Sequence, residues 1–319
     1  MEVLRTVSEL LGSGALSWIV IFVVGLFVLY NSVAIVGGEE VTVIERRWIG
    51  RSMPEGRVVA MRGEVGIAAR VLGPGLHLLV PFLYKTTKHP MVTIDEDEIG
   101  LVESIDGIPV QSGRIFAQAV AGHNFFQDGE AFLRSNGEKG PQIQVLPPGL
   151  YRINPYLFRV EKVPAVSIDN NKIGVVVATD GAPISPGRLL GKRVPDHSNF
   201  QNGEGFLAQG GQKGPQIDVL LPGSYRINSK LFEVQIKDAT MVPAKKVGLA
   251  TARDGEPMPS TEYVAKTVGG HRDFQDAAAF LANGGQRGPQ LDFLRPGTYY
   301  DNPFMFEVAL DDVLQVQRG

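Results

Sequence analysis

Residues 140–151 read GPQIQVLPPGLY, and two close variants, GPQIDVLLPGSY and GPQLDFLRPGTY, occupy residues 214–225 and 288–299. The spacing is 74 residues both times (214 − 140 = 74; 288 − 214 = 74), with no insertion or deletion. Such a repeat indicates one small module used several times to build a surface. Other features keep this register: Asp106-Gly107, Asp180-Gly181 and Asp254-Gly255; His123, His197 and His271.

Each repeat predicts the same order of short elements. In the first repeat, an apolar run at 99–105 leads to Asp-Gly, the pair most typical of a type I′ hairpin. A two-turn helix is predicted at 128–135, with Asp128 as N-cap and Gly137 in the left-handed position after its end. The Gly-Pro-Gln strand, a Pro-Gly turn and a last strand with aromatic residues complete the unit. The matching helices are predicted at 202–209 and 276–282.

A variant unit precedes these repeats. Shifting Gly137 and Gly140 back by 74 gives Gly63 and Gly66, so residues 40–90 are interpreted as a variant unit without the helix. We therefore expect a mainly β (α+β) fold of tandem small antiparallel β modules, each full module with a short helix. The predicted divisions are 1–38 for an N-terminal tail and anchor, 39–94 for the first half-unit, and 95–168, 169–242 and 243–319 for repeats 1 to 3.

Composition excludes some classes of function. The 319 residues carry a net charge of −3, which disfavours a nucleic-acid surface because such surfaces are basic. There is no cysteine, so disulfides and thiol catalysis are excluded. The 38 glycines and 21 prolines favour short strands and turns over long helices.

An apolar segment opens the chain. No charged residue occurs from Leu10 to Gly38, and the 22 residues from Ala15 to Val36 could cross a hydrocarbon core of about 30 Å as a helix. We therefore expect a transmembrane helix that anchors a single-pass protein in a lipid bilayer. A cleaved signal peptide is the alternative, with Ser32-Val33-Ala34 as its site, but Glu2 and Glu9 make a poor leading region. The arginines that follow favour a cytoplasmic body, namely Arg46, Arg47, Arg51 and Arg57.

Three phrases after this segment resemble the opening of an SPFH (Band 7) protein, the superfamily of stomatins, prohibitins and flotillins. They are RGEVG at 62–66, GPGLH at 73–77 and VPF at 80–82. The phrase Leu-x-Pro-Gly-x-Tyr at 294–299 resembles β modules of bacterial flotillin-like proteins, and major vault protein repeats carry similar phrases. The resemblance implies a membrane-attached homo-oligomeric scaffold that organises membrane or partner proteins without catalysis. The long Glu/Ala/Arg-rich helical region that drives assembly in that family is not found in this sequence.

The repeated histidines are the strongest candidates for chemistry. One histidine per module argues against convergence on a metal, and no His-x₃-His spacing occurs, so we expect structural hydrogen bonds. Residues 95–100, DEDEIG, begin like a calcium loop, but Ile99 stands where that pattern needs Asp or Asn. The stretch 187–192 resembles a P-loop with one residue too few between its glycines. Lys139, Lys213 and Arg287 are interpreted as solvated turn cations, with contact to lipid phosphates as the weaker alternative.

These patterns predict no catalytic, cofactor-binding or metal-binding residue and no cofactor. The function they favour is a membrane-anchored, oligomeric scaffold with protein partners of unknown identity and no nucleic acid. Two alternatives stay open. One is an exported module that recognises peptide or polysaccharide, and the other is a membrane-linked hydrolase, which would need unique polar residues in one cleft.

Overall fold

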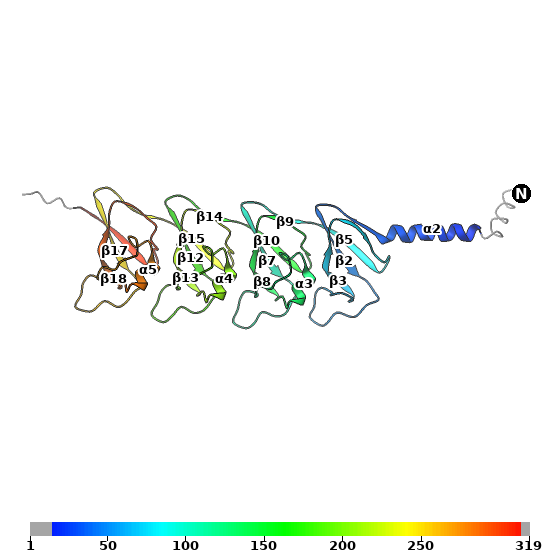
Figure 1. The fold of residues 1–319 in the computed structure, drawn as a ribbon, viewed down its shortest axis with the longest axis horizontal. Coiled ribbons are helices and arrows are strands. Elements are labelled where there is room, and N and C mark those ends of the chain that lie inside the picture. The colour runs from blue at the N-terminus through cyan, green and yellow to red at the C-terminus, as the bar shows by residue number, and fades with distance from the viewer. Residues whose placement is uncertain (1–14, 314–319) are drawn as a thin grey trace, which may run out of the picture.

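The computed structural model describes residues 15–313, and they form four β units in a row. Figure 1 shows this elongated arrangement, with helix α2 (Ala15–Ser32) projecting from the N-terminal end. The fold is mainly β, as the sequence predicts, and its sheets are antiparallel. The first unit has no helix between its strands, which also agrees with the prediction for a variant unit.

Every unit holds a three-stranded sheet and a two-stranded ladder. The three-stranded sheets have the strand orders β3-β2-β5, β8-β7-β10, β13-β12-β15 and β18-β17-β20. The first unit contains β1 (Val33–Val36), β2 (Glu40–Arg46), β3 (Gly66–Leu72), β4 (Gly75–Leu78) and β5 (Tyr84–Pro90). The second contains β6 (Val92–Ile94), β7 (Glu98–Ser104), α3 (Gly129–Arg134), β8 (Gly140–Leu146), β9 (Gly149–Tyr151) and β10 (Phe158–Pro164).

The last two units repeat the second. The third contains β11 (Val166–Ile168), β12 (Lys172–Ala178), α4 (Gly203–Ala208), β13 (Gly214–Leu220), β14 (Gly223–Tyr225) and β15 (Phe232–Asp238). The fourth contains β16 (Thr240–Val242), β17 (Lys246–Ala252), α5 (Ala277–Ala282), β18 (Gly288–Leu294), β19 (Gly297–Tyr299) and β20 (Phe306–Asp312). The short strands β6, β11 and β16 pair with β9, β14 and β19, so we describe each unit from its opening short strand onward.

The Gly-Pro-Gln motif shapes the start of strand β8. Gly140 has φ +114, a backbone conformation that favours glycine, and the register between β7 and β8 shifts just after it. The Gln142 side chain folds back and donates 2.9 Å hydrogen bonds to the carbonyls of Glu138 and Gly140. The motif thus builds a bulged strand start, and Gln216 and Gln290 repeat these bonds.

The short helices begin where the sequence predicts. The Asp128 carboxylate accepts a 2.9 Å hydrogen bond from the Ala131 N–H, and Asn202 and Asp276 cap α4 and α5 in the same way. The prediction for Gly137 is wrong, because the left-handed residue is Asn136 (φ +59). Gly137 is required for a different reason. A Cβ there would approach the Phe132 ring to 2.4 Å.

The predicted Asp-Gly hairpin is also wrong. Strand β7 pairs with β8 and β10, and the chain after Asp106-Gly107 runs as a loop instead of returning as an adjacent strand. Gly107 has φ +138, and a Cβ there would lie 2.3 Å from the Gly137 carbonyl oxygen. The glycine therefore permits a close approach of two backbone segments, while the aspartate has a partner in another unit.

The transmembrane prediction is corrected by the structure. Among residues 15–313, no helix is both long and apolar enough to cross a membrane. Helix α2 has 18 residues, or about 27 Å at 1.5 Å per residue, which falls short of a hydrocarbon core of about 30 Å. The single-pass membrane location and the cytoplasmic placement of the body therefore lose their basis, and the first part of the predicted anchor, residues 1–14, lies outside the described residues.

The predicted apolar segment is divided between two kinds of element. The helix ends at Ser32, and Val33–Val36 form strand β1, which pairs antiparallel with Gly75–Leu78. The Ser32 hydroxyl donates to the Val28 carbonyl at 2.7 Å, and the Leu79 N–H donates to the Ser32 carbonyl at 2.8 Å. The β-branched residues after Ser32 thus join the first unit instead of extending the helix.

Candidate functional site

The most regular constellation in the molecule lies at the junctions between units. The cores of the second, third and fourth units are each completed by two apolar side chains of the preceding unit. Phe116 and Ile143 belong to the core of the third unit, and Leu190 and Ile217 belong to the core of the fourth. Val59 and Ala69 play the same part for the second unit. The units are therefore joined by shared hydrophobic cores and not by flexible linkers alone.

The aspartate of each Asp-Gly pair binds the loop of the preceding unit. The Asp106 carboxylate accepts hydrogen bonds from the N–H groups of Val58 at 2.8 Å and Val59 at 2.9 Å, and it pairs with Arg57. Burial opposes ionisation of Asp106, but these donors outweigh it and hold the pKa below its ordinary value of 3.8. The next two junctions repeat the contact: Asp180 with Ile115 and Phe116, and Asp254 with Leu189 and Arg188.

A buried asparagine makes a second contact at the same junctions. The Asn228 side-chain amide donates to the carbonyls of Gln142 at 3.3 Å and Ile143 at 3.1 Å, both in strand β8 of the preceding unit. The other junctions repeat this contact: Asn154 to Ala68 and Ala69, and Asn302 to Gln216 and Ile217. Sequence reasoning missed these residues, although they keep the 74-residue register (154 + 74 = 228; 228 + 74 = 302) and could have been found by it.

Replacing Asn228 with alanine should destabilise the chain. Two carbonyls at a buried junction would lose their donor, at a cost of about 1–3 kcal/mol in the free energy of unfolding. The measurement is a urea titration followed by circular dichroism. Ser229→Ala, one residue further and exposed, is the matched control, and equal midpoints for the two variants would contradict the assignment.

The repeated histidines have structural partners. The His123 Nδ1 accepts a 2.8 Å hydrogen bond from the Phe126 N–H, and its ring lies 4.4 Å from the Phe126 ring. This bond closes a turn in which Asn124, Phe125 and Phe126 all have positive φ, which is unfavourable for L-residues and needs such support. His197 and His271 make the same bond, so the expected structural hydrogen bonding is observed.

Protonation of His123 and His197 should destabilise the fold. Burial lowers the pKa of both His123 and His197, and an imidazolium could not accept the bond at Nδ1. Because the unfolded chain binds protons near pH 6.5 and the folded chain binds them only at lower pH, stability is present above about pH 6.5 and falls as the pH drops below it. Thermal unfolding at pH 7.5, 6.5 and 5.5 should show a falling midpoint. A His197→Asn variant should show a smaller fall, and an equal fall would contradict this role.

The other predicted motifs do not gather into a reactive centre. In the DEDEIG stretch, the Glu98 N–H donates to the Asp95 carbonyl at 3.1 Å, closing the turn between β6 and β7. Among the residues that the structure describes, no group of three or more histidine and acidic side chains is arranged to hold a metal ion. Lys139, Lys213 and Arg287 are exposed at equivalent positions of three units.

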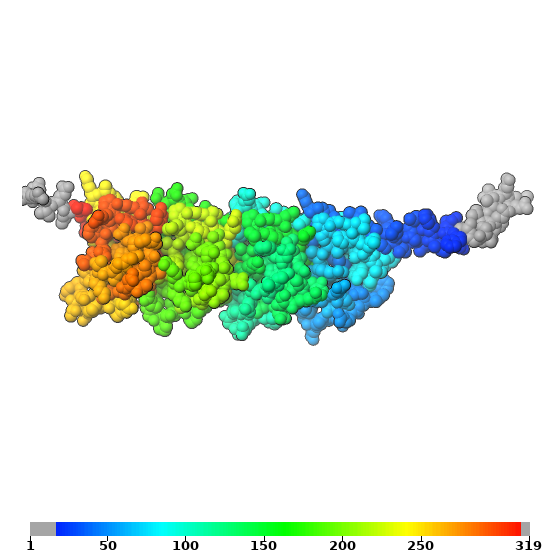
Figure 2. All heavy atoms as spheres, viewed as in Figure 1, coloured from blue at the N-terminus to red at the C-terminus, as the bar shows by residue number. Residues whose placement is uncertain are grey.

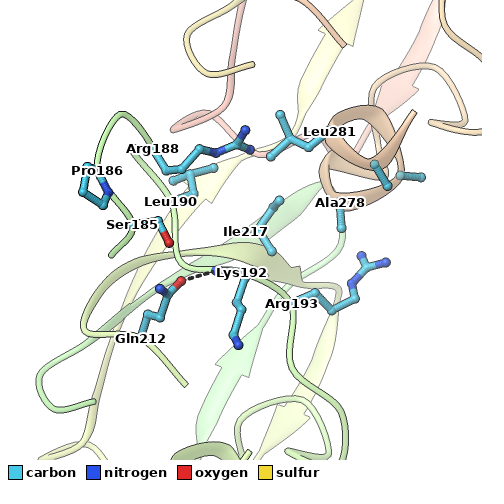
Figure 3. Close-up of a pocket in the computed structure, with 12 residues that line it drawn as sticks. Ser185, Pro186, Arg188, Leu190, Lys192, Arg193, Gln212, Ile217, Ala278 and Leu281 are labelled. Carbon is cyan, nitrogen blue, oxygen red and sulfur yellow. Dashed lines mark hydrogen bonds between the residues drawn. The ribbon is translucent and has the colours of Figure 1, made fainter. Parts of the chain in front are cut away.

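A groove lies at each junction, between the helix of one unit and the loop of the unit before it. The groove at the last junction has a volume of about 760 Å³. Figure 3 shows Ile217 near its centre, Arg188 and Leu190 on the loop side, and Leu281 and Arg193 on the helix side. Both arginines are already paired, Arg188 with Asp254 and Arg193 with Asp218 and Asp276. Part of the stretch that resembles a P-loop therefore lines this groove and contributes to the junction.

Comparison with known proteins adds no assignment. No family model matches the chain, and no curated protein matches it. The resemblance to SPFH and flotillin proteins therefore has no support beyond the quoted phrases, and the case for function depends on the geometry of the units.

Proposed function

We propose that this chain is a non-catalytic scaffold that associates side by side into a homo-oligomer. The observation that carries the proposal is the sharing of core residues across all three junctions. Because each unit completes its core with side chains of its neighbour, the units hold a constant relation and repeat their outer surfaces along the row. Weak contacts made once per unit then add up between two aligned chains.

The outer edge strands provide a surface for such contacts. Strands β5, β10, β15 and β20 each pair on one side only among the described residues, and an open strand edge favours pairing with another chain. In the first two units, Lys88 and Lys162 occupy one register position, and lysine is a residue that protects edges. Ile236 and Leu310 take that position in the third and fourth units and are exposed. The proposed contact therefore involves the edges of these two units.

A double variant tests the proposal. Ile236→Lys with Leu310→Lys gives the third and fourth units the residue that the first two already carry, so the fold should be retained. We expect wild-type chains to associate with rising concentration in sedimentation velocity, and the double variant to need at least about tenfold higher concentration.

The control places two lysines outside strands β5, β10, β15 and β20. Leu221 and Met241 are also exposed, and their double change to lysine should leave association unaltered. A wild-type chain that stays strictly monomeric at high concentration would refute the scaffold, and equal behaviour of the two double variants would refute the edge.

A further inference from the structure

The outer end of the fourth unit exposes side chains whose equivalents are buried at every internal junction. Leu291 is 64% exposed, whereas Ile217, at the same register position, is 6% exposed. Val264 is 43% exposed against 4% for Leu190, and Leu249 is 45% exposed against 0% for Val175. Leu190 and Ile217 are the residues that the third unit contributes to the core of the fourth. Val264 and Leu291 are thus placed to contribute to the hydrophobic core of one further unit in the same way.

We propose that this end of the fourth unit is a docking surface for one further β module of the same repeat type. Three internal junctions supply the template for the contact. The incoming module would place the side chain of its Asp-Gly position against the N–H groups of Tyr263 and Val264, and its asparagine amide against the carbonyls of Gln290 and Leu291. Its helix would begin with glycine or alanine, because Gly129, Gly203 and Ala277 hold that position at the observed junctions.

The course of the backbone supports the same arrangement. The Val313 N–H donates to the Lys245 carbonyl at 3.0 Å. The Ala165 N–H makes the equivalent bond at 2.7 Å where the chain passes from the second unit to the third. The Ala239 N–H makes it at 2.8 Å where the chain passes from the third unit to the fourth. The fourth unit therefore ends in the conformation that the other units have when a module follows them. In Figure 2 this unit, in orange and red, lies at the end of the row opposite helix α2.

A second copy of this chain lacks the matching face. When β2 is aligned with β7, so that Glu40 matches Glu98, the position of Asp106 is occupied by Trp48. The position 74 residues before Asn154 is occupied by Val80, so the first unit has neither the aspartate nor the asparagine of the junction contacts. The first unit also has no helix between its strands. The leading faces of the other three units are covered by their neighbours. The occupant is therefore a module with an intact and uncovered leading face, which a second copy of residues 15–313 does not offer.

Charge gives this end its own selectivity. Glu262 occupies the register position of Arg114 and Arg188 (188 + 74 = 262). At the last internal junction Arg188 pairs with the incoming Asp254, so Glu262 would repel an aspartate held the same way. The natural partner is expected to carry an asparagine or glutamine there, because an amide oxygen can accept the same N–H bonds without this repulsion.

The test keeps the full chain and repeats residues 239–312 once after Asp312. Hydrogen exchange of the amides of β18 should slow at least about tenfold relative to the unextended chain, as these amides become part of an internal junction. Leu291→Asp should leave the unextended chain unaltered and destabilise the extended one. A second extended chain that carries Glu262→Arg removes the repulsion and should strengthen both effects.

Two results would overturn the proposal. In the first, the β18 amides exchange at an unchanged rate and the added module is unfolded, both in the extended wild-type chain and in the extended chain with Glu262→Arg. The other is self-association of the unextended chain that Leu291→Asp abolishes, since a second copy would then be the occupant. The proposed side-by-side association depends on Ile236 and Leu310 and not on Leu291. The edge-strand double variant therefore tests that association independently of this docking surface.

Discussion

Replacing Phe206 with alanine should cost about 3–5 kcal/mol in the free energy of unfolding. The side chain is fully buried, and its ring centroid lies 4.9 Å from that of Phe232 and 6.1 Å from that of Phe200. A Cβ at Gly211 would approach this ring to 2.4 Å, so the glycine and the aromatic ring fill one space together. Truncation would leave a cavity bounded by other rings, which cannot collapse easily.

The same change should loosen the junction with the second unit. Phe206 shares its core cluster with Phe116 and Ile143, which belong to the preceding unit. Urea titration should therefore show a lower midpoint, and hydrogen exchange should show faster opening of β8 as well as β12. The control is Leu207→Ala, a partly buried neighbour that faces the groove, where less apolar area is lost. If β8 exchanges at the wild-type rate in Phe206→Ala, the cores are not coupled.

Local features of the fold could be predicted from the sequence because their causes are local. Asp128 caps the helix that begins one residue later, and Phe132 follows at a spacing that turns it inward. The 74-residue register likewise predicts equivalent units without knowledge of their shape. Strand β7 lies within one residue of its predicted start for the same reason, because it is a continuous apolar run before a turn.

Features that depend on another unit could not be predicted in this way. Asp-Gly is a hairpin signal in isolation, but the Asp106 carboxylate binds Val58 and Val59 far back in the chain, and these contacts replace the turn. The sequence of the apolar segment predicts one continuous helix, but its last residues pair with strand β4, a contact that the local sequence does not indicate. The junction asparagines carry no local signal at all, and only their register marks them.

Replacing Asp301 with isoleucine should stabilise the chain by about 2–4 kcal/mol. Ile153 and Ile227 occupy this register position in the second and third units and are buried (153 + 74 = 227; 227 + 74 = 301). Asp301 is equally buried, and its Oδ1 has no hydrogen-bond partner among the described residues. Burial raises its pKa, although a hydrogen bond with Thr240 opposes this shift. The register position of Thr240 is occupied by valine in the second and third units, Val92 and Val166. The polar pair Thr240 and Asp301 has therefore replaced a valine–isoleucine pair.

The gain should depend on pH in a definite direction. The folded chain holds the Asp301 proton above the ordinary pKa of 3.8, so this site favours the folded state at acid pH and loses that contribution as the pH rises. The stability difference between Asp301→Ile and the wild type should therefore widen from pH 4 to pH 7, as measured by urea titration at both values. Asp301→Asn also removes the ionisable group, so its stability difference from the wild type should widen by a similar amount, but its gain should be smaller because it keeps a polar group at the buried site. An Asp301→Ile variant that is less stable than the wild type at pH 7 would contradict this prediction.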